Sequence, residues 1–170
     1  MAIPLAKMRK SNFSPIVTVD TQVLILGSLP GDASLVASRY YAHPQNRFWH
    51  LAGAVIARED LPELHYEVQL ETLLAAGVGL WDTVASAERD GSMDAAIRNP
   101  KAAPLIDLIV AMPRLRAIAF NGATAARIGR RALGETELTL IDLPSSSPAH
   151  AAIRYDGKLE RWAALKQFLI

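Results

Sequence analysis

The chain has 170 residues, 51% of them hydrophobic and 21% charged, which fits one well-buried domain and leaves too little chain for two ordinary ones. It has no cysteine, so disulfides, thiolate zinc sites, a cysteine nucleophile and iron–sulfur clusters are excluded. The net charge of +1 is by itself weak evidence for a nucleic-acid partner.

The distribution of charge is more informative than its sum. Residues 108–134 hold five arginines and no acid, whereas residues 59–71 hold five acids and no lysine or arginine. This segregation allows a basic face that binds a polyanion, but two separately solvated surfaces would give the same pattern.

The first 20 residues are interpreted as a loose arm that leads into the domain. They contain Lys7, Arg9 and Lys10 but no continuous apolar core behind these charges, so they do not resemble a signal peptide. No apolar run elsewhere is long enough to cross a bilayer. We therefore expect a cytoplasmic protein that binds no membrane, and the absence of cysteine fits that compartment.

Strands and helices are expected to alternate along the chain. Residues 23–28 are a short apolar run that ends in glycine and proline, as a buried parallel strand does. Val68, Leu70, Leu73 and Leu74 follow helical spacing. In chain order we expect a strand at 23–28, helices at 48–57 and 66–76, a strand at 78–81, a helix at 104–112, a strand at 116–120, a helix at 123–133, a strand at 138–143 and a helix at 158–170.

Strands separated by helices imply an α/β domain with a parallel sheet that is covered on both faces. Ligands bind such sheets outside the carboxyl ends of the strands. That rule selects four loops, which are also the segments richest in polar residues, glycine, proline and serine: 29–46, 82–93, 121–124 and 144–150.

The segment GSLPGDAS, residues 27–34, follows the first expected strand. It is neither a Walker A loop nor GxGxxG, and it does not contain a GxSxG nucleophile elbow. Two interpretations of the segment are left. It is a tight turn that brings backbone N–H groups close to a ligand, or a turn that only leads the chain out of the strand.

The segment YYAHPQNRFW, residues 40–49, combines aromatic rings with an amide and an arginine. This composition suits stacking on a nucleobase and hydrogen bonding to its edge. Phe48 and Trp49 are expected to be core residues, whereas Tyr40 and Tyr41 are the better candidates for a stacking wall.

Two further polar positions follow later strands. Asp82 could accept a base N–H or orient water, or it could simply cap the next turn. The segment LPSSSPAH, residues 143–150, offers small hydroxyls for a DNA phosphate. A serine-hydrolase arrangement of Asp142, Ser146 and His150 lacks an elbow, and the histidines of the chain show no metal-ligand spacing.

Together, four segments resemble the uracil-DNA glycosylase superfamily and, within it, the hypoxanthine-DNA glycosylase branch. They are LILGSLPGDASLVASRYYAHPQNRFW, AGVGLWDTV, AFNGATAA and LPSSSPAHA, in the order of the family. The resemblance runs over nearly the whole chain, and implies one domain, residues 1–170, with a three-layer α/β/α fold around a four-stranded parallel sheet. It implies an enzyme that flips a damaged nucleotide out of DNA and hydrolyses its N-glycosidic bond, with no cofactor and no metal.

Two positions depart from the uracil-type pattern. Many members have Asn or Asp before the proline of the first motif to position the attacking water, and here that residue is Leu29. The last motif often opens with His, and here it opens with Leu143. In the hypoxanthine branch the important asparagine is that of YYAHPxN, which is Asn46. These departures favour hypoxanthine, with uracil and xanthine as alternatives.

The resemblance and the chemistry of the motifs assign roles to single residues. We expect no strand-cleaving lyase step, because no lysine lies in the motifs to form a Schiff base. A damage-binding module that does not cut, or a small nucleoside hydrolase, are the alternative functions, and we expect a monomer. The expected catalytic residues are Asn46 and His150, the base-binding residues Gly27, Ser28, Leu29, Gly31, Tyr41 and Asp82, and the DNA-binding residues Arg47, Asn121, Ser145, Ser146, Ser147 and Pro148.

Overall fold

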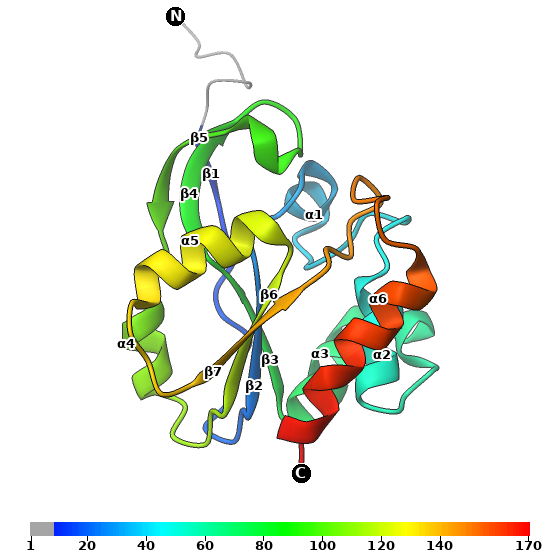
Figure 1. Ribbon diagram of the computed structural model, residues 1–170. Helices are drawn as coiled ribbons and strands as arrows, with labels where there is room; N and C mark the ends of the chain where they lie inside the picture. The colour runs from blue at the N-terminus through cyan, green and yellow to red at the C-terminus, as the bar shows by residue number, and fades with distance from the viewer. Residues whose placement is uncertain (1–8) are drawn as a thin grey trace, which may run out of the picture.

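The computed structural model describes residues 9–170 and contains the expected parallel sheet (Figure 1). The four strands run parallel in the order β3-β2-β6-β7, and the register pairs Gly27 with Asp82 and Asn121 with Leu143. Their bounds are β2 Val23–Gly27, β3 Val78–Asp82, β6 Ala117–Asn121 and β7 Thr139–Leu143. The predicted α/β fold class is confirmed.

Helices cover both faces of this sheet. In β2, Val23 and Ile25 pack into the core under one helical layer, whereas Leu24 and Leu26 pack under the other, as the alternation of side chains along a strand requires. Figure 1 shows the two layers on opposite sides of the strands. One layer comprises α2 Phe48–Val55, α3 Tyr66–Ala75 and α6 Tyr155–Trp162, and the other α4 Leu105–Val110 and α5 Ala123–Leu133.

The predicted last helix, 158–170, is wrong in its bounds. The α-helix α6 begins at Tyr155 and ends at Trp162, and a tighter 3₁₀ segment, η4, continues over Ala163–Phe168. Trp162 is fully buried and donates its indole N–H to the carbonyl of Pro144 at 3.0 Å. Leu165 is also fully buried, and a 3₁₀ turn keeps residues three apart on one side. Burial of both side chains therefore explains the change of winding.

A second, three-stranded antiparallel sheet was not expected. It comprises β1 Arg9–Ser11, β4 Val84–Arg89 and β5 Ile97–Ala102 in the order β1-β4-β5. The prediction of a loose arm is therefore wrong from Arg9 onward, and residues 1–8 of that arm lie outside the described residues. Half of the segment predicted as the loop 82–93 is strand β4.

Three short helical segments complete the described part of the chain. Helix α1 Asp32–Ala37 forms within the predicted loop 29–46, η2 Leu61–Glu63 precedes α3, and η3 Asp94–Ala96 joins β4 to β5. Within residues 9–170, no helix is both long and apolar enough to span a membrane.

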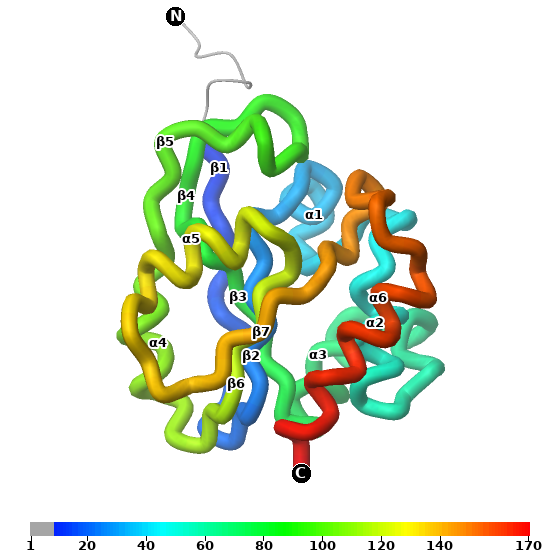
Figure 2. The backbone as a smooth tube through the Cα atoms, in the orientation of Figure 1, coloured from blue at the N-terminus to red at the C-terminus, as the bar shows by residue number. Residues whose placement is uncertain are grey.

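The carboxyl ends of the parallel strands point to one end of the molecule. The tube in Figure 2 shows that the small sheet, α1 and the segment between β7 and α6 gather at this end. The loops that the sequence singles out therefore lie together, around one edge of the central sheet.

Candidate active site

A cleft of about 450 Å³ opens at the carboxyl ends of the parallel strands. Three parts of the chain enclose it. Its floor is formed by Gly27, Asp82 and Asn121, at the ends of β2, β3 and β6. The wall, residues 89–96, connects β4 to β5 of the small sheet, and the serine loop, residues 144–150, follows β7. Every site residue predicted from the sequence lines the cleft except Arg47.

Gly27 is the point at which two functional side chains converge. A Cβ atom at this position would lie 2.8 Å from Oδ1 of Asp82 and 3.1 Å from the hydroxyl of Tyr41. Only glycine leaves room for both groups above the end of β2. The backbone of the floor is thus shaped to place a carboxylate and a phenol side by side.

Asp82 is a buried carboxyl that lacks a full set of partners. Its side chain is 3% exposed, and no group of the described residues donates a hydrogen bond to its Oδ2. The pKa of Asp82 is raised to about 7, chiefly by burial and also by the negative charge of Asp94, while the positive charge of Arg89 opposes the shift. A buried, perturbed and unpaired carboxyl at the floor of a cleft is a strong candidate for a functional group.

Tyr41 is held in an unusual conformation beside Asp82. Its φ of 54° lies in the left-handed region, which costs a bulky residue about 1–3 kcal/mol and commonly marks a functional site. Its ring stacks on Phe48 with centroids 3.8 Å apart and an angle of 14° between the ring planes. Burial and the charge of Asp82 raise the pKa of the Tyr41 phenol, so it stays protonated, and its hydroxyl has no partner within residues 9–170. Phe48 therefore covers one face of the ring, and the buried hydroxyl next to Gly27 is left with its hydrogen bond unmade.

The turn after β2 is fixed by side chains of the wall. Ser28 donates its hydroxyl to Asp94 at 2.6 Å. Arg89, which is 1% exposed, donates to the carbonyls of Leu29 at 3.3 Å and Pro30 at 2.6 Å. The backbone N–H groups of Ser28, Leu29 and Gly31 donate to no acceptor among the described residues, so they can donate to a ligand.

Asn46 lines the cleft at the start of α2. Its Oδ1 accepts the backbone N–H of Phe48 at 2.9 Å, and its own backbone N–H donates to the carbonyl of His43 at 3.0 Å. These bonds fix the side chain, while the second lone pair of Oδ1 and the Nδ2 group remain for other partners.

The serine loop is clamped to the sheet by Asn121. The Nδ2 group of Asn121 donates to the hydroxyl of Ser146 at 2.9 Å, and its Oδ1 accepts the backbone N–H of the same residue at 2.9 Å. Ser146 is 1% exposed and its carbonyl accepts the backbone N–H of Arg47 at 3.0 Å. Ser147 and Pro148 stand further out. Asn121 and Ser146 thus place the loop, and their contact with DNA stays a prediction.

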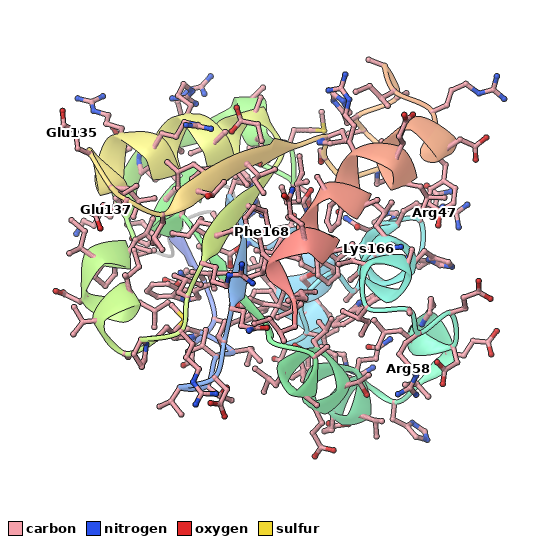
Figure 3. The ribbon with its side chains drawn as sticks, turned by 60° about the horizontal axis from the view of Figure 1, so that its bottom comes forward. Arg47, Arg58, Glu135, Glu137, Lys166 and Phe168 are labelled. Atoms are coloured by element: carbon pink, nitrogen blue, oxygen red, sulfur yellow. The ribbon has the colours of Figure 1, made fainter. Side chains whose placement is uncertain are left out.

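Two other predicted residues differ in their placement. His150 lines the cleft, and its buried Nε2 has no partner in the described part of the chain. The guanidinium of Arg47 lies 5.7 Å from the ring centroid of Tyr155, outside the cleft lining. Figure 3 shows Arg47 on the outer side of the molecule close to α6. Its predicted contact with DNA would therefore fall beside the cleft.

Comparisons with known proteins agree with this geometry. The family model "Uracil DNA glycosylase superfamily" matches residues 15–168. The chain belongs to the uracil DNA glycosylase superfamily. A protein of Methanosarcina barkeri named hypoxanthine DNA glycosylase is 38% identical over 78% of this chain and 85% of its own length. A protein of the same name from Methanosarcina acetivorans is 37% identical over 93% of this chain and 98% of its own length.

The structural comparison gives the same family. A solution NMR structure of a protein from Methanosarcina acetivorans, assigned to the uracil DNA glycosylases, has a TM-score of 0.82. It is 34% identical and the match covers 95% of this chain and 99% of that chain. The predicted resemblance is thereby confirmed, and the protein is a DNA glycosylase of this superfamily.

Sequence reasoning missed three residues that build this glycosylase site. Arg89 and Asp94 fix the turn after β2, and Lys158 of α6 donates to the carbonyls of Ser147 at 3.4 Å and His150 at 2.8 Å. Loss of hydration on burial lowers the pKa of Lys158. None of the three belongs to a motif, and each acts on residues of another segment, so no local pattern signalled them. Within residues 9–170, no cluster of three or more potential metal ligands occurs.

Proposed function

We propose that this DNA glycosylase removes hypoxanthine from DNA by hydrolysis of the N-glycosidic bond, leaving an abasic site. The observation that carries the proposal is the buried carboxyl of Asp82, whose Oδ2 has no partner at the floor of the cleft. The names of the two similar proteins from Methanosarcina support the choice of base.

The floor suits the hydrogen-bonding edge of hypoxanthine. This base presents an N1–H donor beside the acceptor O6. The ionised carboxylate of Asp82 would accept N1–H, and the free backbone N–H groups of Ser28 and Leu29 would donate to O6. Adenine has an unprotonated N1 and would leave the carboxylate buried without a partner, a mismatch that typically rejects a substrate strongly.

The residues around the floor supply the rest of the chemistry. Asn46 orients a water molecule toward the sugar as the bond from C1′ to the base breaks with oxocarbenium character. The departing base gains negative charge, which backbone N–H groups and His150 stabilise. Leu29 lines the cleft where many members have Asn or Asp, and it cannot perform the task that we assign to Asn46.

The enzyme stops at base removal, because no lysine lines the cleft in the described part of the chain. Lys158 is held by two carbonyls beneath the serine loop. The hydroxyls of this loop would hold DNA phosphates, so binding should weaken steeply with salt.

The test is a gel assay on labelled duplexes that carry one hypoxanthine, uracil or xanthine, with alkali to reveal abasic sites. The wild type should cut the hypoxanthine duplex, and Asn46→Ala should lose at least 100-fold in rate. Gln45→Ala is the matched control, since this neighbouring amide does not line the cleft. Preferential cleavage of uracil would overturn the choice of base.

Two other outcomes separate the alternative functions. Tight binding to hypoxanthine DNA without an abasic product would identify a binding module that does not cut. Activity on free deoxyinosine would identify a nucleoside hydrolase. A borohydride-trapped DNA adduct would contradict the proposed hydrolysis by water alone.

A further inference from the structure

Two buried polar groups on the floor of the cleft have unmade hydrogen bonds and complementary chemistry. The hydroxyl of Tyr41 and Oδ2 of Asp82 are both buried, and neither has a hydrogen-bond partner within residues 9–170. A phenol has a proton to donate, whereas an ionised carboxylate only accepts. Because an unmade hydrogen bond is costly in a buried place, two such groups side by side are expected to satisfy one another.

Both groups approach the same point above the end of β2. A Cβ atom on Gly27 would lie 2.8 Å from Oδ1 of Asp82 and 3.1 Å from the hydroxyl of Tyr41. The backbone of Asp82 is fixed by its register with Gly27, and the ring of Tyr41 is fixed by its stacking on Phe48. The carboxyl is therefore the group that turns, and a rotation about its side-chain bonds would bring it to the hydroxyl.

Other side-chain donors beside this carboxyl are engaged or face elsewhere. Both ends of the Asn121 amide are bonded to Ser146 at 2.9 Å. The methyl carbon of Thr83, the next residue in the chain, lies 2.9 Å from the point where a Cβ would sit on Gly129 of α5, so this side chain faces the helix and not the cleft. Tyr41 is thus the neighbouring donor that is left for the carboxylate.

The charges around the pair favour this bond near neutral pH. Burial, and then the charge of Asp94, raise the pKa of Asp82 to about 7, whereas Arg89 lowers it. The phenol of Tyr41 stays protonated, because burial and the charge of Asp82 raise its pKa. Tyr40, the other phenol close to this carboxyl, donates its hydroxyl to a backbone carbonyl at 3.3 Å. A hydrogen bond to the charged form of a carboxyl lowers its pKa, so donation by Tyr41 favours ionisation.

We propose that the Tyr41 hydroxyl donates a hydrogen bond to the carboxylate of Asp82 and holds it in the ionised form that accepts N1–H of the base. The carboxylate has enough lone pairs for both donors. Tyr41 is then a positioning residue that acts on the base through Asp82, and this role belongs to its hydroxyl and not to its ring. The recognition of N1–H rests on the proposed function, whereas the bond between the two side chains is measurable without DNA.

The test is a carbon-13 NMR titration of the Asp82 carboxyl in the free protein. Tyr41→Phe keeps the ring and removes only the hydroxyl, so the midpoint of the titration should move up by about one pH unit. Tyr66→Phe is the matched control, since its hydroxyl lies outside the cleft lining and accepts the backbone N–H of Tyr40 at 3.0 Å. It should leave the midpoint in place. An unchanged midpoint in Tyr41→Phe would overturn the proposal.

Single-turnover excision of hypoxanthine connects this bond to recognition of the base. Tyr41→Phe should slow excision about tenfold at pH 6.5 and less than about twofold at pH 9, because the two enzymes differ in the ionised fraction of Asp82. In an Asp82→Asn background, loss of the hydroxyl should change the rate less than about twofold.

Two outcomes of the excision assay separate the proposals. A loss of equal size at every pH and in the Asp82→Asn background would mean that the hydroxyl contacts the base directly, and would overturn the inference. A wild type that cuts no hypoxanthine DNA, with the NMR midpoint moved as expected, would overturn the proposed function and support the bond between the two side chains.

Discussion

The floor of the cleft and the wall beside it each bury a charged side chain, but only the one in the wall has its hydrogen bonds satisfied. On the floor, Asp82 is buried with an oxygen that has no partner, and its pKa rises to about 7. In the wall, Arg89 is equally buried, but it donates to the carbonyls of Leu29, Pro30 and Gly91 and lies 3.7 Å from a carboxylate oxygen of Asp32.

This difference indicates that Asp82 serves ligand binding, whereas Arg89 stabilises the fold around the cleft. An unpaired buried carboxyl destabilises the empty fold and is retained where a ligand completes its hydrogen bonds. A buried guanidinium with its donors satisfied holds the surrounding backbone in place. Substitutions on the floor should therefore reduce activity without reducing stability, whereas substitutions in the wall should reduce stability first.

The largest effect is expected for Arg89→Met. Removal of the guanidinium leaves the buried carbonyls of Leu29 and Pro30 without their donor, so the free energy of unfolding should fall by ~3–5 kcal/mol. Urea unfolding followed by circular dichroism measures this loss. Arg98→Met is the control, because Arg98 is exposed on β5, and it should change stability by less than ~0.5 kcal/mol. Equal stability of the two variants would refute the supporting role of the wall.

Gly27→Ala should mainly affect activity. The added methyl group would displace the carboxylate of Asp82 or the phenol of Tyr41, so excision of hypoxanthine should slow about 100-fold, equivalent to ~2.7 kcal/mol. Gly31→Ala is the matched control in the same turn, where a Cβ would meet Ser92 at an ordinary 3.5 Å and the backbone N–H is kept. Single-turnover rates compare the two, and similar rates would mean that the contact above Gly27 is unimportant.

Asp82→Asn should stabilise the empty protein above neutral pH. In the unfolded chain the carboxyl ionises near 3.8, whereas in the folded protein it ionises near 7. The folded state therefore binds the extra proton, and its stability falls as the pH rises from about 4 to about 7. The variant should gain ~2 kcal/mol over the wild type at pH 8 and nothing at pH 4, because a buried amide retains part of the desolvation cost. Thermal unfolding at the two pH values measures this, and a gain that is independent of pH would contradict it.

The smallest effect is expected for Lys158→Met. Its loss removes the bonds that hold the carbonyls of Ser147 and His150, so the serine loop should loosen and duplex excision should slow about threefold. Lys166→Met, at an exposed position of η4, is the control and should have no effect. A loss that exceeds the effect of Gly27→Ala would assign Lys158 a direct role in the reaction.

The same contrast explains what the sequence allowed us to predict. The parallel strands are apolar runs bounded by glycine and proline, so their local pattern predicts both the central sheet and the loops at its carboxyl edge. Asn46, Tyr41 and Asp82 lie in those loops, and their residue types indicate base recognition. The placement of Asp82 beside Gly27, where it meets Tyr41, depends on the register of β2 and β3, which no single segment specifies.

The small sheet could not be predicted in this way. Strand β5 is an exposed edge, and β4 contains register irregularities and buries a charged arginine, so neither shows regular apolar alternation. Arg89 gains its role from carbonyls about 60 positions earlier in the chain. Sequence patterns thus revealed the chemistry of the site, whereas its support came from contacts between distant segments.

We propose above all that the ionised carboxylate of Asp82 recognises hypoxanthine by accepting a hydrogen bond from its N1–H. The most direct test is the pH dependence of single-turnover hypoxanthine excision by the wild type and by Asp82→Asn. The wild-type rate should rise with pH through about 7 and then level off, because only the ionised carboxylate accepts this hydrogen bond. Asp82→Asn should be at least 100-fold slower and lack this rise. An Asp82→Asn enzyme with the rate, the pH profile and the base selectivity of the wild type would contradict the claim.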